Sequence, residues 1–137
     1  MKIAIVGAGA IGLGLAALCE HLGHTVLVVS PSGASTAFLV KGEPLEAVGT
    51  VAGSFRPRAA SLETALGEAE LVVLAVPANA MGRLIGAAAP LLTPDHDVII
   101  SSHSSFAALV LRRRLAARGL KVPIAAWSTT LATGRRL

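Results

Sequence analysis

The stretch that decides the fold is residues 1–14, MKIAIVGAGAIGLG. An apolar run at residues 2–6 leads directly into the pattern G-x-G-x-x-G, and helical spacing follows it. A strand before this pattern and a helix after it form the context in which the glycines bind a dinucleotide. The sequence therefore predicts a dinucleotide-binding turn formed by Gly7, Ala8, Gly9, Ala10, Ile11 and Gly12.

Each glycine of this turn has its own expected role. Gly7 allows the tight turn out of the strand, Gly9 lets the backbone approach the pyrophosphate, and Gly12 lets the helix pack closely on the sheet. Ala10 and Ile11 supply free amides at the positive end of the helix. Two other interpretations stay open: a glycine turn needed only for packing, and a methyltransferase-type cofactor site.

Apolar runs alternate with helical patterns along the rest of the chain. Strands are expected at 2–6, 25–29, 71–76, 97–101 and 122–127, and helices at 10–22, 34–41, 61–67, 79–92 and up to 118. This alternation predicts an α/β Rossmann fold, a doubly wound and mainly parallel sheet in three layers. Residues 33–58 lack the pattern and predict a short irregular or antiparallel insertion. Residues 1–137 are expected to form one NAD(P)-binding domain.

Local signals predict where some helices begin and how they face the sheet. Ser61 and Asn79 are expected to cap the helices that follow them. In the first helix, a stripe at helical spacing is expected to face the sheet: Ile11, Leu15, Leu18 and Leu22.

The composition of the chain limits the kinds of partner that it is expected to bind. No run reaches about 18 uninterrupted apolar residues, so a membrane span is not expected. Three Phe and one Trp are scattered through the chain, too few for a base-stacking nucleic-acid surface. The lone Cys19 has no partner for an internal disulfide, which favours a cytoplasmic location. No His or Cys residues have metal-binding spacing, so no metal is expected.

The loop after the second strand bears on the choice between NAD and NADP. An acid there binds the ribose hydroxyls of NAD, and its absence admits the additional phosphate of NADP. The loop here begins at Ser30, contains Ser32, and has no acid before Glu43. Ser30 and Ser32 are therefore candidate ligands and NADP is slightly favoured, although Ser30 could equally just end the strand.

Ligands of such sheets lie outside the carboxyl ends of the strands. Segments expected to face the cofactor therefore follow three later strands: Val76, Pro77 and Ala78; residues 101–104, with Ser102 and His103 as candidate ligands; and residues 128–130. His103 could assist proton transfer, because its ordinary pKa lies near neutrality. It could also line the nicotinamide side or stand exposed at a helix start.

Three segments resemble a known family. Residues 1–30 are similar to the opening of dehydrogenases related to 6-phosphogluconate dehydrogenase. ALGEAELVVLAVPANAMGRLIGAAAPLL (65–92) and VPIAAWSTTLATGRRL (122–137) resemble octopine, nopaline and other opine dehydrogenases. The resemblance implies NAD(P)H-dependent condensation of an amino acid with a 2-oxo acid. It also implies a helical C-terminal catalytic domain beyond this chain, so the chain alone is expected to be inactive and its catalytic residues stay unassigned.

Two alternatives to the opine dehydrogenase hypothesis remain. One is a free-standing regulatory domain that senses NAD(P) and could form a homodimer. The other is the cofactor domain of a keto-acid reductase. A chain that works with a missing or separate catalytic domain is expected to expose an apolar patch, for which Trp127, Leu131 and Leu137 are the candidates.

Overall fold

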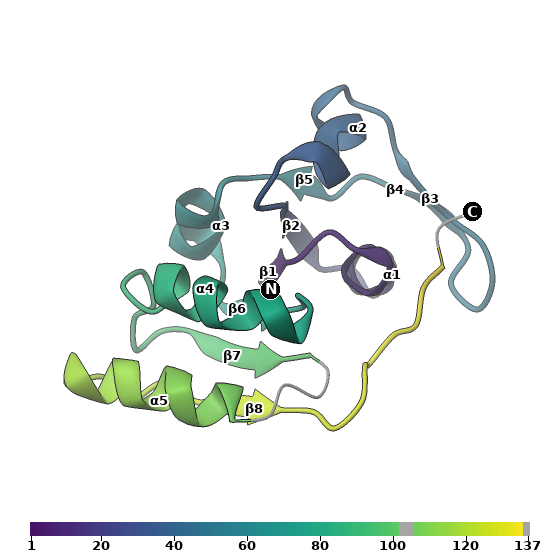
Figure 1. The fold of residues 1–137 in the computed structure, drawn as a ribbon. Coiled ribbons are helices and arrows are strands. Elements are labelled where there is room, and N and C mark those ends of the chain that lie inside the picture. Colours follow the sequence, from purple (N-terminus) through teal and green to yellow (C-terminus); the bar gives the residue numbers. More distant parts are fainter. Residues whose placement is uncertain (102–105, 136–137) are drawn as a thin grey trace.

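Six parallel strands form the central sheet of the computed structural model, which describes residues 1–101 and 106–135 (Figure 1). Their order is β5-β2-β1-β6-β7-β8, and every pair of neighbours is parallel. The strands are β1 (Lys2–Val6), β2 (Thr25–Val29), β5 (Arg58–Ala59), β6 (Leu71–Leu74), β7 (Asp97–Ile100) and β8 (Ile124–Ala126). The expected doubly wound α/β fold is confirmed.

Helices cover both faces of this sheet and create its three layers (Figure 1). The helices are α1 (Ala10–His21), α2 (Ala37–Val40), which follows the short 3-10 helix η1 (Ala34–Thr36), α3 (Leu62–Glu68), α4 (Ala78–Ala88) and α5 (Ala107–Ala117). One apolar cluster joins the sheet to α3, α4 and α5, and a second joins its other face to α1. Among the described residues, no helix is long and apolar enough to cross a membrane.

The insertion at 33–58 contains the expected antiparallel piece. β3 (Leu45–Ala47) and β4 (Gly53–Phe55) pair as a separate two-stranded sheet. The sequence analysis missed β5, whose two residues pair with Leu27 and Val28 at the edge of the main sheet. A two-residue edge strand that begins with an arginine has neither the length nor the alternation that reveals a strand.

The first expected helix cap is confirmed and the second is wrong. Ser61 Oγ accepts a hydrogen bond from the Thr64 amide at 3.1 Å and caps α3. Helix α4 begins at Ala78 with Pro77 as its N-cap and no side-chain cap, so Asn79 lies inside the first turn. The helix also ends at Ala88, earlier than expected, because Pro90 has no amide hydrogen with which to continue the helical hydrogen bonds.

Helix α1 is rotated relative to the expected stripe. Leu15 is buried as expected, but Leu22 is 63% exposed and Ile11 and Leu18 are only partly buried. The buried set is Gly12, Leu13, Leu15, Ala16, Ala17 and Cys19. The close approach of Gly12 to the sheet fixes the rotation of the helix, and its neighbours therefore turn inward with it.

Candidate dinucleotide-binding site

The glycine turn lies where the strand order reverses. From β1 the chain runs through α1 to β2 on one side, whereas β6 lies on the other side of β1. Such a switch point leaves a crevice at the carboxyl ends of the strands, where ligands of this architecture bind. The turns after β1 and β6 meet there, because Gly7 packs against Ala75 and Val76.

The carboxyl ends of five neighbouring strands, β2, β1, β6, β7 and β8, lie at the same level along the sheet. Four backbone N–H groups just past the strands donate to neighbouring carbonyls: Gly7 to Val29 (2.9 Å), Ala75 to Val6 (2.7 Å), Ser101 to Leu74 (2.9 Å) and Trp127 to Ile100 (3.1 Å). We call the residues that follow the strands the edge row: Ser30, Gly7, Ala75, Ser101 and Trp127. Successive side chains of a strand alternate between faces. Since Val6, Val29, Leu74 and Ile100 belong to the cluster with α3–α5, the edge row is directed to the α1 side.

The space around Gly7 and Gly12 is filled by other backbone atoms, so no residue with a side chain fits at either position. Gly7 has φ 123°, a left-handed conformation that favours glycine, and an added Cβ would overlap the Ala75 carbonyl. A Cβ on Gly12 would overlap the carbonyl oxygen of Gly7. These contacts lock α1 onto the end of β1.

Gly9 is different because its surroundings are open. It is exposed, has extended backbone, and forms the N-cap of α1. A Cβ placed on Gly9 would meet no atom within 4 Å. The first turn of α1 contains no acid, and no side chain of the described residues caps it. Free amides and the positive end of the helix dipole therefore adjoin an empty space, the arrangement that binds phosphate.

The structure places Val76, Pro77 and Ala78 beside this turn. Val76 is buried, and its Cγ1 lies 3.1 Å from the Cβ position of Gly7. Pro77 and Ala78 are exposed, and Ala78 opens α4 at the same edge. Two helix starts therefore face the crevice from neighbouring strands.

Ser30 and Ser32 lie in the loop that follows β2, at one end of the edge row. Ser30 is partly buried, and its carbonyl accepts from the Gly33 amide at 3.0 Å, which closes a tight turn that leaves Ser32 exposed. The first arginines that follow this loop in sequence are engaged elsewhere. The Arg56 guanidinium donates to the Gly42 carbonyl at 2.9 Å, and Arg58 pairs with Glu68.

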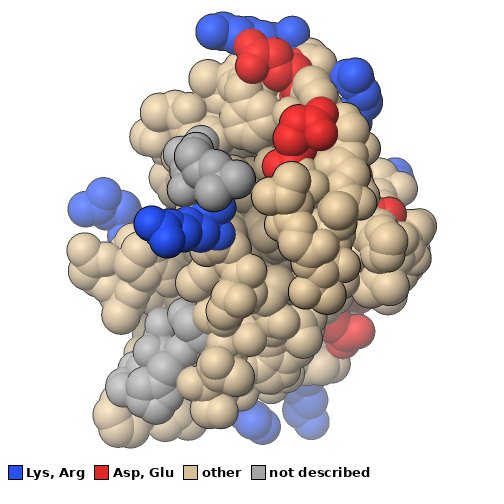
Figure 2. All heavy atoms as spheres, turned by 90° about the vertical axis from the view of Figure 1, so that its right-hand side faces the viewer, with Lys and Arg blue, Asp and Glu red and all other residues tan. Residues whose placement is uncertain are grey.

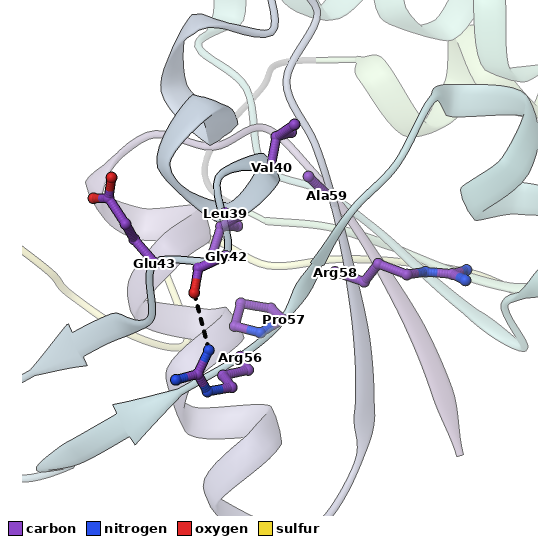
Figure 3. Close-up of a pocket in the computed structure, with 8 residues that line it drawn as sticks. All are labelled: Leu39, Val40, Gly42, Glu43, Arg56, Pro57, Arg58 and Ala59. Atoms are coloured by element: carbon purple, nitrogen blue, oxygen red, sulfur yellow. Dashed lines mark hydrogen bonds between the residues drawn. The ribbon is translucent and has the colours of Figure 1, made fainter.

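Arg56 and Arg58 belong to a separate hollow, shown in Figure 3. This cavity of about 530 Å³ lies between α2 and β5, and Figure 3 shows the Arg58 side chain directed away from it. None of its lining residues belongs to the edge row; they are Leu39, Val40, Gly42, Glu43, Arg56, Pro57, Arg58 and Ala59. The cavity is therefore not the site that the sequence predicts.

Two predicted site residues, Ser102 and His103, lie outside the described residues. Ser101 begins the same predicted segment, and the structure places it in the edge row with 1% exposure. A serine directly after an apolar strand marks the carboxyl edge, which is why the sequence pointed to this segment.

Two other titratable side chains have structural roles. His96 is buried; its Nδ1 accepts from the Thr93 amide at 2.9 Å, and its Nε2 donates to the Leu66 carbonyl at 2.8 Å. Burial raises the pKa of the Cys19 thiol, so the thiol stays protonated and unreactive. Within the described part of the chain, no cluster of three or more His, Cys, Asp or Glu residues could hold a metal.

Strands β7 and β8 point to the right in Figure 1, so Figure 2 shows the face of the molecule on which these two strands end. Uncharged side chains form much of this face, and acidic groups gather in its upper part. The segment after β8 returns along this side towards α1. There Gly134 packs against the Ala10 carbonyl and lies 3.5 Å from the Cβ position of Gly14.

Comparison with known proteins identifies the family. Residues 3–118 match the family model described as ketopantoate reductase PanE/ApbA. The chain belongs to this family. A comparison with curated protein sequences gave no match. The family supports the keto-acid reductase alternative better than the opine dehydrogenase resemblance.

Solved structures agree with this assignment. A PanE/ApbA family ketopantoate reductase from Ralstonia eutropha is 27% identical, with a TM-score of 0.71 over 92% of this chain and 40% of that chain. Two matches below 25% identity share the fold. They are a putative 2-dehydropantoate 2-reductase from Enterococcus faecalis (21%, TM-score 0.62, 83% and 37% covered) and 3-hydroxyisobutyrate dehydrogenase from Mycobacterium tuberculosis (19%, 0.67, 91% and 38%). The chain spans about two fifths of the length of these relatives.

Proposed function

We propose that this chain is the NAD(P)H-binding part of a reductase that acts on a 2-oxo acid of the ketopantoate type. One observation carries the proposal: Gly9 is open between two glycines whose surroundings are filled. Packing alone explains Gly7 and Gly12, but it does not explain a glycine at the helix start with no atom within 4 Å. A phosphate group close to the backbone does explain it.

The residues of the crevice fit such a cofactor. Amides of residues 9–11 would hold the pyrophosphate, and Val76, Pro77 and Ala78 would line the adjoining wall. When bound, the reduced nicotinamide supplies a hydride, and the protein supplies position and surroundings.

We propose NADP(H) as the preferred cofactor. The loop at Ser30 and Ser32 presents hydroxyls and, from Ser30 to Gly42, no carboxylate. A carboxylate would repel the additional phosphate of NADP, whereas hydroxyls can hydrogen-bond to it. Calorimetry with NADPH and NADH tests this choice. Tighter binding of NADPH is expected, and equal or tighter binding of NADH would exclude the preference.

We further propose that catalytic groups come from a part of the protein beyond the described residues. The relatives are more than twice as long as this chain, and the edge row, all of whose residues are described, contains no acid or base. The 137-residue chain is therefore expected to bind the cofactor without turning over ketopantoate. Turnover of an amino acid with a 2-oxo acid by the longer protein would instead favour opine chemistry.

Replacement of Gly9 by valine tests the binding site itself. Because the added side chain meets no protein atom within 4 Å of its Cβ, we expect Gly9→Val to fold with an unchanged melting temperature. The valine would occupy the phosphate space, so binding of both NADPH and NADH should be lost in calorimetry.

Gly67→Val is the matched control. Gly67 is an exposed residue of α3 with equally open surroundings, and this variant should bind like the unaltered chain. Retained affinity in Gly9→Val would overturn the proposal, as would absence of binding by the unaltered chain.

A further inference from the structure

Ser101 holds a buried hydroxyl for which the described part of the chain offers no hydrogen-bond partner. Its side chain is 1% exposed, and Oγ is the one buried side-chain polar atom without a hydrogen-bond partner among the described residues. A buried polar atom left without a partner is unfavourable and uncommon in native proteins. Its presence calls for a function.

The position of Ser101 connects it to the crevice. It belongs to the edge row, next to Ala75, and its amide donates to the Leu74 carbonyl at 2.9 Å. The preceding Ile100 packs in the cluster with α4 and α5, so Ser101 is directed to the α1 side. Only β6 lies between β7 and β1, so Ser101 is two strand spacings from β1, about 10 Å along the edge row.

That distance matches the part of a dinucleotide that lies beyond its pyrophosphate. With the pyrophosphate at the start of α1 and the adenosine towards Ser30, the other half of the molecule must extend over β6 and β7. The nicotinamide carboxamide at that end has donors and an acceptor, and a serine hydroxyl can serve either.

We propose that Ser101 Oγ hydrogen-bonds to the nicotinamide carboxamide of the bound cofactor and fixes the orientation of its ring. This inference rests on the proposed function. Ser101 is then a cofactor-positioning residue, and its free hydroxyl reduces the stability of the chain without ligand.

Trp127 offers a direct signal for this event. It occupies the edge-row position beside Ser101, because Ile100 and Ala126 are partners in the β7–β8 register. It is also the single tryptophan of the chain. Oγ is covered in the absence of ligand, so neighbouring side chains must shift when the carboxamide reaches it, and the emission of Trp127 should change.

The test compares ligands with and without a nicotinamide in the unaltered chain, Ser101→Ala and the control Ser54→Ala, an exposed residue of β4. Titrations use NADPH and 2′-phospho-ADP-ribose. We expect Ser101→Ala to weaken NADPH binding about tenfold, as loss of one buried hydrogen bond would. Binding of 2′-phospho-ADP-ribose should stay unchanged, and the melting temperature should rise because the unpaired hydroxyl is gone. Ser54→Ala should match the unaltered chain.

Each other outcome overturns the inference. Equal weakening of both ligands would place the effect of Ser101 on the fold or the adenosine side. Unchanged NADPH affinity would show that the hydroxyl does not contact the nicotinamide. If the unaltered chain binds neither ligand, the proposed function fails, and this inference fails with it.

Discussion

Helices α1 and α5 begin at the same edge of the sheet, yet their first residues differ in almost every respect. Neither helix has a side-chain cap among the described residues. The N-cap of α1 is Gly9 in extended backbone, whereas the N-cap of α5 is Phe106 at φ 63°. One start is relaxed and open to an anion, and the other is strained and carries an aromatic ring that is 74% exposed. Position in the sheet alone therefore does not determine the backbone conformation or the exposure of a helix start.

The outer faces of the two helices differ as well. The exposed stripe of α5 combines Phe106, Leu109 and Val110, while α1 exposes no large apolar residue before Leu22, its C-cap. The apolar patch expected near Trp127 is only partly present. Leu131 is 57% exposed, Trp127 is half-buried, and Leu137 lies outside the described residues.

The largest effect is expected from Gly12→Ala, which attacks the contact that fixes α1. The new methyl group would overlap the Gly7 carbonyl, and Gly7 is held at the end of β1 by the hydrogen bond from its amide to the Val29 carbonyl. We expect a loss of about 3 kcal/mol or more in the free energy of unfolding, measured in urea.

The matched control is Gly82→Ala in α4. A Cβ there meets no atom within 4 Å, so this variant should gain up to about 1 kcal/mol from helix propensity alone. Similar stability of the two variants would show that the glycine turn does not fix α1.

A smaller and opposite effect is expected from Phe106→Gly. Glycine adopts a positive φ without steric strain, and the exposed ring loses little packing, so unfolding should cost about 1 kcal/mol more than in the unaltered chain. Phe106→Ala keeps the strain and should gain nothing. If both variants have the same melting temperature, the strain at the start of α5 contributes no instability.

The segment that follows β8 contacts α1 at Gly134, and this contact offers a local test. Gly134→Val should push this segment off the Ala10 carbonyl. Hydrogen exchange of residues 128–135 is expected to accelerate, while global stability falls by less than about 1 kcal/mol. Unchanged protection of this segment would show that the contact is not needed to hold it.

The smallest effect lies away from both helix starts, at Glu68. The hydrogen bond from Arg58 holds the pKa of this partly exposed carboxyl below its ordinary value. The folded state therefore gains stability above that ordinary value, and the gain disappears as pH falls through the lowered pKa. Arg58→Gln should lower the urea midpoint slightly at pH 7 and not at pH 2. An equal difference at both pH values would assign the effect to packing.

The sequence predicts the features that neighbouring residues determine, and it does not predict those that arise only when the chain is packed. The turn at residues 7–12, the central strands and the Ser61 cap follow local rules, and the structure has them at the expected residues. Strand β5 depends on pairing with Leu27, about 30 residues earlier, which no local pattern records. The rotation of α1 depends on how closely Gly12 packs on Gly7 in three dimensions, which the spacing of apolar residues does not show. The hydroxyl of Ser101 belongs to this second class, because only the packed structure reveals that it has no partner.

The strand order also determines when each strand can pair with its neighbours during synthesis. Strand β1 pairs with β2, which follows it closely, and with β6, where Ile3 meets Leu71. During synthesis, one side of β1 therefore stays unpaired until most of the first 75 residues have been made. The chain loses the entropy of closing this long loop before the hydrogen bonds between β1 and β6 stabilise it. This order slows folding and leaves an aggregation-prone strand edge exposed. The central position that makes β1 the support of the glycine turn therefore also leaves it paired on one side only while α1, β2 and the insertion are made.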